Sequence, residues 1–254
     1  MTTQDTYRTP ERKILPFARW APGWAFYTKM VSIVWRASRW AKKGEYTSEK
    51  WIRSSVGIVR ALESVGVKFE VENLTAFKKL QSPCVFIGNH MSTLETFVLP
   101  CIIRPYLEIA FVVKEDLVKY PFFKHVMIST DPIVVTRTDA RSDLRAVLDR
   151  GQERLRRNIS VIIFPQKTRT VDFNPKQFNT IGIKLAKRAG TPIVPFALKT
   201  NAWGNGRRIK DFGKIDPSKT VHIRFGDPMT IKNHGKEEHE FIIRFIQDKL
   251  RTWA

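Results

Sequence analysis

The chain has 254 residues, which is enough for one large α/β domain with peripheral helices. Its 44 Lys and Arg outnumber 24 Asp and Glu, and the formal net charge of +20 indicates an anionic partner: nucleic acid, an acidic membrane surface, or a phosphorylated or acidic substrate. Only two cysteines, Cys84 and Cys101, occur in the sequence, so we expect no disulfide scaffold and a reducing compartment.

The N-terminal part divides into a polar start and two amphipathic stretches. We expect residues 1–13 to be mobile and to carry no secretion signal. An aromatic and basic stretch follows at residues 16–40, and a second amphipathic stretch follows at 48–65. Neither contains the roughly 18 to 20 uncharged apolar residues that span a bilayer. We therefore expect residues 1–66 to form a mobile N-terminus and an amphipathic two-helix hairpin.

The hairpin stretch holds five of the seven Trp of the chain: Trp20, Trp24, Trp35, Trp40 and Trp51. Trp flanked by Arg and Lys is typical of a helix that lies in a membrane interface. The alternative is a hairpin packed on the core with solvated cations. Because Trp is unfavourable to expose to water, we expect the hairpin to bind an anionic membrane surface.

Beyond the hairpin, short apolar runs alternate with segments of helical periodicity. Strands are predicted at residues 68–71, 85–88, 109–113, 133–136, 160–164, 193–198 and 221–225. Helices are predicted at residues 92–103, 140–157, 180–189 and 237–250. This alternation predicts a single mixed sheet covered by helices on both faces, formed by residues 67–254. The loops 165–178 and 200–218 are long enough to be functional, and we interpret the tip of the second loop, residues 203–208, as a basic lid.

A polar junction follows the predicted strand 85–88, where Asn89, His90, Ser92 and Glu95 stand close together in the sequence. Five helical residues turn through about 500°, so His90 and Glu95 meet only if His90 lies in the loop and Glu95 in the first helical turn. A carboxylate placed in this way holds an imidazole as a general base. The alternative is a capping box, in which Ser92 caps the helix and Glu95 reaches back to it.

Five sequence blocks, in order within residues 83–196, resemble the glycerolipid acyltransferase family, which includes lysophosphatidate acyltransferases. The blocks are Asn89-His90-x4-Glu95, similar to NHx4D; residues 111–117 with Lys114, followed by Pro121; residues 133–137, ending in Arg137; residues 164–169, similar to FPEGTR; and residues 193–196, similar to the VPV block. The hairpin ahead of them also resembles that of bacterial members. The resemblance implies that residues 67–254 form an α/β acyltransferase domain.

The resemblance also implies a role for each candidate site residue. His90 is expected to be the general base, and Glu95 to fix its tautomer, while the acceptor hydroxyl attacks an acyl thioester directly. Arg169 and Arg137 are expected to bind the acceptor phosphate with help from Lys114. Asn89 is expected to orient the loop.

This sequence departs from the family pattern at three positions. Glu95 replaces Asp; because either carboxylate can accept an imidazole N–H, we expect activity to survive and Glu95→Asp to be nearly neutral. Gln166 replaces Glu, and Lys167 replaces Gly, while Thr168 is retained. These changes alter the expected acceptor pocket. Lys167 is expected either to face the phosphate beside Arg169 or to point to solvent.

The expected function is the transfer of a fatty acyl group to a lysophospholipid, with 1-acylglycerol 3-phosphate as the first candidate acceptor and phosphatidate as its product. The acyl donor is acyl-CoA or acyl-carrier protein, and no metal or other cofactor is expected. We expect a peripheral or monotopic protein at the cytoplasmic face of the membrane. The alternatives are another lysolipid acceptor, a catalytically silent lipid-binding relative, and a basic nucleic-acid-binding protein, which only the sequence pI of about 10.2 favours.

Overall fold

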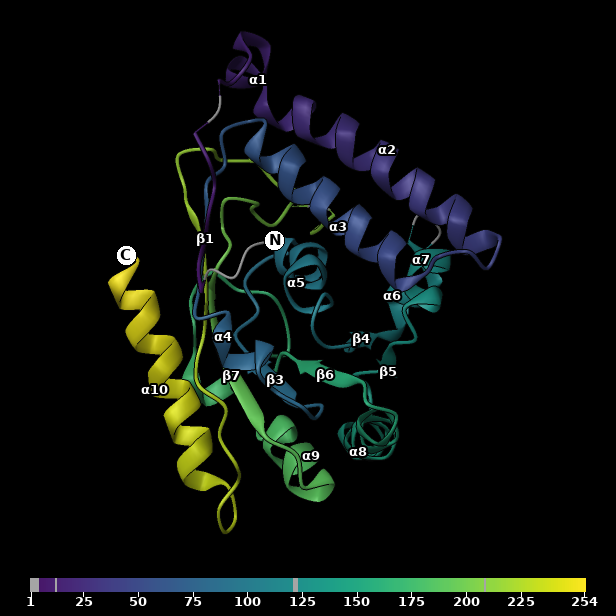
Figure 1. Ribbon diagram of the computed structural model, residues 1–254, viewed down its shortest axis with the longest axis vertical. Helices are drawn as coiled ribbons and strands as arrows, with labels where there is room; N and C mark the ends of the chain where they lie inside the picture. Colours follow the sequence, from purple (N-terminus) through teal and green to yellow (C-terminus); the bar gives the residue numbers. More distant parts are fainter. Residues whose placement is uncertain (1–4, 12, 121–122, 208) are drawn as a thin grey trace.

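Apolar runs bounded by Gly, Pro and polar residues form the strands of one mixed sheet. The computed structural model describes residues 5–11, 13–120, 123–207 and 209–254. Its strands are β1 (Tyr7–Arg8), β2 (Phe69–Glu72), β3 (Val85–Gly88), β4 (Ile109–Lys114), β5 (Ile133–Val135), β6 (Ser160–Ile163), β7 (Ile193–Lys199) and β8 (Val221–Phe225). Within these described ranges they form one sheet in the order β1-β2-β8-β7-β3-β6-β4-β5. Figure 1 labels the strands β7, β3, β6, β4 and β5 of this sheet.

The strands β7, β3, β6, β4 and β5 are parallel, and they form the half of the sheet that carries the polar junction. All residues of β3 and β6 are buried, as expected for parallel strands covered on both faces. Gly88 ends β3 and pairs with Phe196 of β7. A Cβ at Gly88 would lie 2.4 Å from the Phe196 ring, so this close approach requires glycine at the end of the strand.

The other half of the sheet is mixed and includes a strand that the sequence did not predict. Strand β8 runs antiparallel to β7, β2 runs parallel to β8, and the short edge strand β1 runs antiparallel to β2. The expectation that residues 1–13 are mobile is therefore wrong for Tyr7–Arg8. The Tyr7 hydroxyl also donates to the Glu63 carboxylate at 2.5 Å, which ties this segment to the hairpin.

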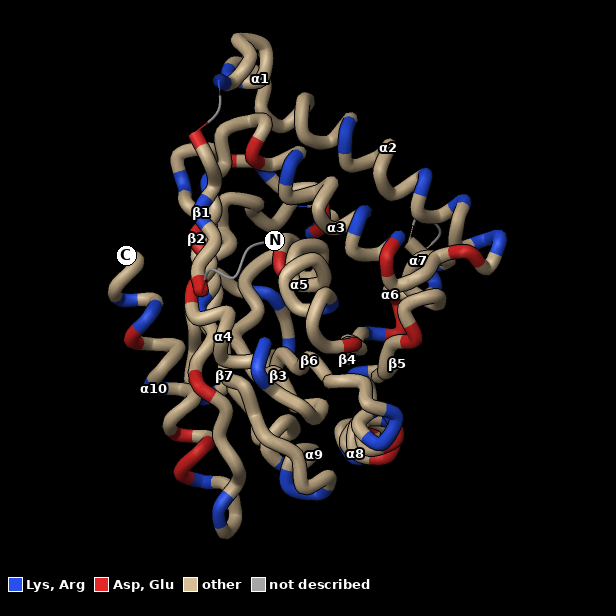
Figure 2. The backbone as a smooth tube through the Cα atoms, in the orientation of Figure 1, with Lys and Arg blue, Asp and Glu red and all other residues tan. Residues whose placement is uncertain are grey.

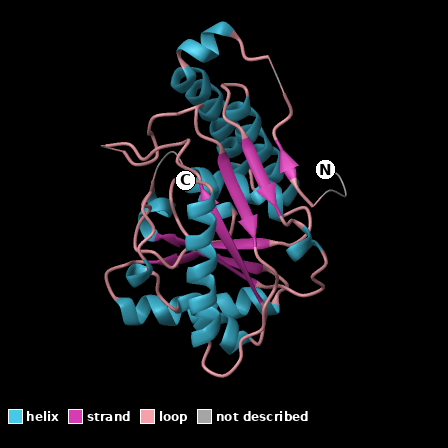
Figure 3. Cartoon of the chain, turned by 90° about the vertical axis from the view of Figure 1, so that its left-hand side faces the viewer, coloured by secondary structure: helices cyan, strands magenta, loops and turns pink. Residues whose placement is uncertain are grey.

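The helices cover both faces of the sheet (Figure 3). They are α1 (Pro16–Trp20), α2 (Pro22–Lys42), α3 (Ser48–Glu63), α4 (Thr75–Lys78), α5 (Leu94–Ile103), α6 (Glu115–Lys119), α7 (Lys124–Ser129), α8 (Ala140–Arg156), α9 (Ile181–Ala189) and α10 (Lys236–Thr252), with one 3₁₀ turn at Pro175–Gln177. Apolar residues of α2, α3 and α5 pack on one face, and those of α8, α9 and α10 pack on the other. The predicted α/β class with one mixed sheet is confirmed.

The predicted hairpin is present, but its first helix is divided. The sequence predicts one helix over residues 16–40, whereas the structure ends α1 at Trp20 and begins α2 at Pro22. Proline lacks a backbone N–H and is favoured at the first helical position, which accounts for the break. No helix of the described residues is long and apolar enough to cross a membrane.

The hairpin and the sheet share one hydrophobic core. Phe26 and Met30 of α2 and Leu62 of α3 are buried in the same cluster as the sheet residues Phe86 and Phe196.

Helix α3 also supports α5 at Pro100, which lies inside that helix. The Ser55 hydroxyl accepts from the Cys101 N–H at 2.9 Å and donates to the Phe97 carbonyl at 2.6 Å. The Ser55 hydroxyl thus bridges the Cys101 N–H and the Phe97 carbonyl, which would otherwise bond to each other within the helix. This contact fixes α5, whose first turn carries Glu95, against α3.

Candidate active site

The candidate residues converge at the carboxyl edge of the parallel strands. His90 follows β3, Lys114 ends β4, Arg137 lies two residues beyond β5, and Gln166 and Arg169 follow β6. Open α/β sheets bind ligands at this edge because the loops after parallel strands meet there.

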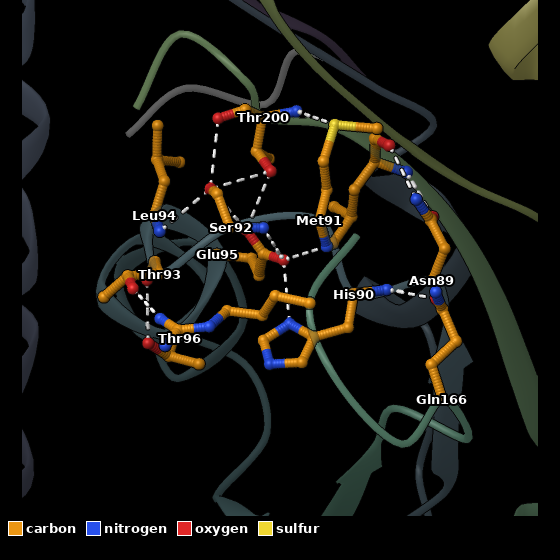
Figure 4. A network of polar contacts seen from close by, with 12 residues as sticks. Asn89, His90, Met91, Ser92, Thr93, Leu94, Glu95, Thr96, Gln166 and Thr200 are labelled. Atoms are coloured by element: carbon orange, nitrogen blue, oxygen red, sulfur yellow. Dashed lines mark hydrogen bonds and ion pairs between the residues drawn. The ribbon is translucent and has the colours of Figure 1, made fainter. Parts of the chain in front are cut away.

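His90 and Glu95 form the expected pair. The His90 Nδ1 lies 2.9 Å from Glu95 Oε1, with His90 in the loop after β3 and Glu95 in the first turn of α5 (Figure 4). Since the buried carboxylate oxygen can only accept when ionised, Nδ1 carries the proton and Nε2 is left as the basic nitrogen.

Glu95 is fully buried in a network of donors. Its Oε1 accepts the backbone N–H groups of Met91 at 2.7 Å and Ser92 at 2.9 Å, and its Oε2 accepts the Thr200 hydroxyl at 2.8 Å (Figure 4). The bond from Ser92 N is one half of a capping box, but the N-cap of α5 is Thr93, which forms no side-chain capping bond, so the capping-box alternative holds only in part. Burial raises the pKa of Glu95, but hydrogen bonding to His90, the charge of His90 and these donors outweigh it and leave the pKa below its ordinary value.

The His90 ring is held flat and leaves one nitrogen accessible. It stacks on Phe164, with ring centroids 4.3 Å apart and planes inclined by 16°, and its side chain is 14% exposed. Within the described part of the chain, Nε2 forms no hydrogen bond. This nitrogen can therefore accept a proton from a substrate that enters from solvent.

The loop that carries His90 is clamped by the segment after β6. The His90 N–H donates to Gln166 Oε1 at 2.6 Å, and the His90 carbonyl accepts from the Thr170 N–H at 3.0 Å. Gln166 is buried, and its neutral amide supports the backbone of His90.

Asn89 has a specific structural role that the sequence did not reveal. Its Oδ1 accepts the Leu198 N–H and its Nδ2 donates to the Leu198 carbonyl, both at 2.8 Å. The side chain thus continues the pairing between β3 and β7 one residue beyond Gly88. This contact fixes the point at which the chain leaves the sheet toward His90.

Arg169 is paired with an acid that the sequence analysis missed. Its Nη1 lies 2.6 Å from Asp211 Oδ1 and also donates to the Thr93 hydroxyl, and both charged side chains are 17% exposed. Asp211 lies in the loop 200–218, three residues beyond the predicted lid tip. The available signal was that Asp211 is the single acid between residues 200 and 215, within a basic segment.

Arg137 reaches the same segment from β5. Its backbone is left-handed, with φ of 62°, and its N–H donates to Asp143 Oδ2 at 2.6 Å. Its guanidinium donates to the Lys167 carbonyl. Although the residue is exposed as a whole, partial burial of the guanidinium and the charge of Arg169 lower the pKa of Arg137, against the charge of Asp143. Arg137 and Arg169 therefore face one region.

The remaining candidates lie at the rim of the site. Lys114 is half-buried and forms an ion pair with Asp116. Lys167 and Thr168 are exposed, and Thr168 Oγ1 accepts from Lys210 Nζ at 2.9 Å. Lys167 accepts from Arg137 through its backbone carbonyl, and the residue is exposed. This arrangement favours the alternative that the Lys167 side chain points to solvent.

The segment 200–215 is anchored at its start. Trp203 is fully buried and packs edge-on against Phe26 of α2, with ring centroids 4.8 Å apart, and stacks on Phe97 of α5 at 5.5 Å. The interpretation of the Trp203 end as the tip of a lid is therefore wrong, because this indole belongs to the core.

The outer side of α1 and α2 carries a row of exposed apolar side chains, which we call the aromatic face. It consists of Phe17, Trp20, Trp24, Val31 and Trp35. Lys and Arg recur along the same helices (Figure 2), and Arg39 lies over the Trp35 ring at 4.8 Å. The other two Trp of the hairpin, Trp40 and Trp51, are half-buried, so only part of the predicted Trp set is exposed.

Comparisons with known proteins cover the part of the chain that carries this site. The family model described as Acyltransferase matches residues 68–199. The chain is 30% identical over 209 residues to the 1-acyl-sn-glycerol-3-phosphate acyltransferase of Pseudomonas aeruginosa, covering 82% of this chain and 75% of that protein. It is 29% identical over 196 residues to the protein of the same name from Borreliella burgdorferi, covering 74% of this chain and 73% of that protein.

A solved structure has the same fold. The crystal structure of the 1-acyl-sn-glycerophosphate (LPA) acyltransferase PlsC from Thermotoga maritima superposes with a TM-score of 0.67 over 93% of this chain and 96% of that chain, at 16% sequence identity. The family match includes the His90–Glu95 pair and the Arg169 segment. The resemblance seen in the sequence blocks is thereby confirmed, and the chain belongs to the acyltransferase family.

Proposed function

We propose that this acyltransferase moves a fatty acyl group from an acyl thioester to the free hydroxyl of 1-acylglycerol 3-phosphate, giving phosphatidate. The observation that carries the proposal is the His90–Glu95 pair at 2.9 Å, in a loop whose Thr93 hydroxyl also accepts from Arg169. The names of the bacterial relatives support the choice of acceptor. Family membership favours this enzyme over the nucleic-acid-binding alternative.

In the proposed reaction, His90 Nε2 takes the proton of the acceptor hydroxyl as its oxygen attacks the thioester carbonyl. A C–O bond forms, and a tetrahedral oxyanion results. When this intermediate collapses, the C–S bond breaks and the proton on His90 passes to the leaving sulfur. Glu95 remains ionised, because its pKa is lowered, and stabilises the imidazolium between the two proton transfers.

Arg169 and Arg137 would hold the acceptor phosphate. Their guanidinium groups are planar donors that meet phosphate oxygens in pairs, and the charges of the two groups influence one another. Positioning the phosphate next to the loop of His90 brings the hydroxyl of the same glycerol unit toward Nε2. Binding energy at the phosphate would thus serve to orient the reacting group.

This proposal is tested by assaying the purified protein with a panel of lysolipids and with both acyl-CoA and acyl-carrier protein donors. We expect lysophosphatidate to be preferred, and Arg169→Ala to raise its Michaelis constant about tenfold or more, because a charge-assisted contact contributes roughly 1.5–3 kcal/mol. Asp172→Asn, an exposed change in the same segment, serves as the control. Equal use of lysolipids without a phosphate monoester would refute the assigned acceptor.

We further propose that the aromatic face binds an anionic membrane at its cytoplasmic surface, as a peripheral or monotopic attachment. The acceptor is a lipid, and exposed Trp beside Arg and Lys is suited to the region of the headgroups. High salt should weaken this attachment only in part, since inserted aromatic rings are not screened.

The triple variant Trp20→Ser, Trp24→Ser and Trp35→Ser is expected to bind anionic vesicles about tenfold or more weaker, because each exposed indole loses its burial in lipid. Vesicle co-sedimentation measures the change. Phe241→Ser, an exposed aromatic on α10, is the matched control and should bind as the wild type does. Unchanged binding by the triple variant would place the attachment elsewhere on the protein.

A further inference from the structure

Arg169, Thr93 and Asp211 form a closed group of three polar side chains. The Thr93 hydroxyl donates to Asp211 Oδ1 at 2.8 Å and accepts from Arg169 Nη1, while the same Nη1 lies 2.6 Å from Asp211 Oδ1. The three residues come from the start of α5, the segment after β6 and the segment after β7. Both contacts therefore act on one nitrogen of the guanidinium.

The other edge of this guanidinium is unoccupied. In the ranges that the structure describes, Nε and Nη2 of Arg169 form no hydrogen bond or ion pair. A guanidinium presents pairs of N–H groups to a phosphate, and the Nε–Nη2 edge is one such pair. Asp211 and Thr93 thus fix the orientation of the side chain and leave a bidentate edge free.

Asp211 is held by the protein core. Its carbonyl accepts from the Trp203 indole N–H at 3.2 Å, and Trp203 is fully buried. Two residues on, the Gly213 carbonyl accepts from the Tyr27 hydroxyl at 2.5 Å. The two limbs of the segment are so close that a Cβ at Gly213 would lie 1.7 Å from the Gly204 carbonyl oxygen. The segment that carries Asp211 is therefore packed tightly against α2 and α5, which fixes the position of Asp211.

The positive charges of Arg169 and Arg137 give a second reason for an acid at position 211. Arg169 is mostly buried and lies near a second arginine, Arg137, and such a pair is unfavourable without a counter-charge. The segment that carries Arg169 has Gln at position 166, which is neutral. Asp211, from a different part of the chain, supplies a negative charge to Arg169, while Asp143 lies beside Arg137.

We propose that Asp211 is a positioning residue for Arg169, which sets the guanidinium so that its free edge receives the phosphate of the acceptor. The inference rests on the proposed function. Asp211 does not contact the reacting atoms, so its effect lies in acceptor binding. We therefore expect binding of the acyl donor and proton transfer at His90 to be unaffected by Asp211.

Steady-state kinetics of Asp211→Asn test this role. We expect the Michaelis constant for lysophosphatidate to rise about tenfold, with kcat and the Michaelis constant for the donor within about twofold of the wild-type values. Combined with Arg169→Ala, the same change should add nothing further, because its effect passes through that side chain. Asp172→Asn is the control and should leave all three constants unchanged.

An unchanged constant for the acceptor overturns the proposal. A lowered constant also overturns it, since Asp211 would then compete with the phosphate for Arg169. Thr93→Val removes the other contact to Nη1 and should give the same selective rise, so it provides the test if Asp211→Asn fails to fold.

Calorimetric titration with glycerol 3-phosphate separates this inference from the proposed function. Wild-type protein that binds this phosphate monoester through Arg169 but transfers no acyl group refutes the function. In that case, the positioning role is decided by binding alone. It holds if Asp211→Asn weakens the binding about tenfold, and it fails if binding is unchanged.

Discussion

Replacing His90 with Ala is expected to lower the rate of acyl transfer by about 10²- to 10⁴-fold, the usual contribution of a general base. The structure supports a selective effect, because the ring stacks on Phe164 at the surface of the site while the loop is held through the His90 backbone by Gln166 and Thr170. The backbone contacts survive in the variant. The measurement is kcat with saturating lysophosphatidate and donor.

Two controls accompany this variant. Circular dichroism and vesicle binding should match those of the wild type, and His234→Ala, which alters an exposed histidine, should retain full activity. If His90→Ala keeps more than about a tenth of the activity, general-base catalysis by His90 is the wrong account.

Glu95→Gln is expected to lower kcat by about 10²-fold or more, because the imidazolium loses the buried negative charge that stabilises it. The amide can keep its oxygen toward Met91 N and Ser92 N and place its NH₂ toward the hydroxyls of Ser92 and Thr200, which can accept. The fold should therefore persist with a loss of roughly 1–3 kcal/mol in the free energy of unfolding. A normal kcat would contradict the assigned role.

The variant Glu95→Asp keeps the negative charge but shortens the side chain, so it separates the effects of charge and of side-chain length. On the sequence alone this change is expected to be nearly neutral, since a carboxylate remains. In the structure, both carboxylate oxygens are engaged by donors on His90, Met91, Ser92 and Thr200, and a side chain shorter by about 1.5 Å cannot serve all of them. We now expect Glu95→Asp to lower kcat as well, although less than Glu95→Gln does.

The lowered pKa of Glu95 also predicts a dependence of stability on pH. A carboxyl group whose pKa is lower in the folded than in the unfolded state stabilises the fold fully above the unfolded-state pKa. This contribution is lost as the pH falls toward the folded-state pKa. The difference in unfolding free energy between wild type and Glu95→Gln should therefore shrink on acidification.

The sequence alone predicted the strands and helices whose formation depends on the pattern of neighbouring residues. The central strands follow apolar runs bounded by Gly and Pro, and the long helices α3, α8, α9 and α10 follow apolar periodicity, so their positions agree with prediction to within a few residues. The His90–Glu95 pair was also predictable. Its two members are five residues apart, and a strand, a tight loop and a helix start leave few ways to arrange them.

The tertiary structure decided what depends on distant segments. Strand β1 exists because Tyr7 and Arg8 pair with β2, and Asn89 pairs with Leu198, 109 positions away. Arg169 finds Asp211 at a separation of 42 positions. Each of these contacts is made by ordinary polar residues without local periodicity. Their partners were set by which loops the parallel sheet brings to one edge, and that arrangement follows from packing the whole core.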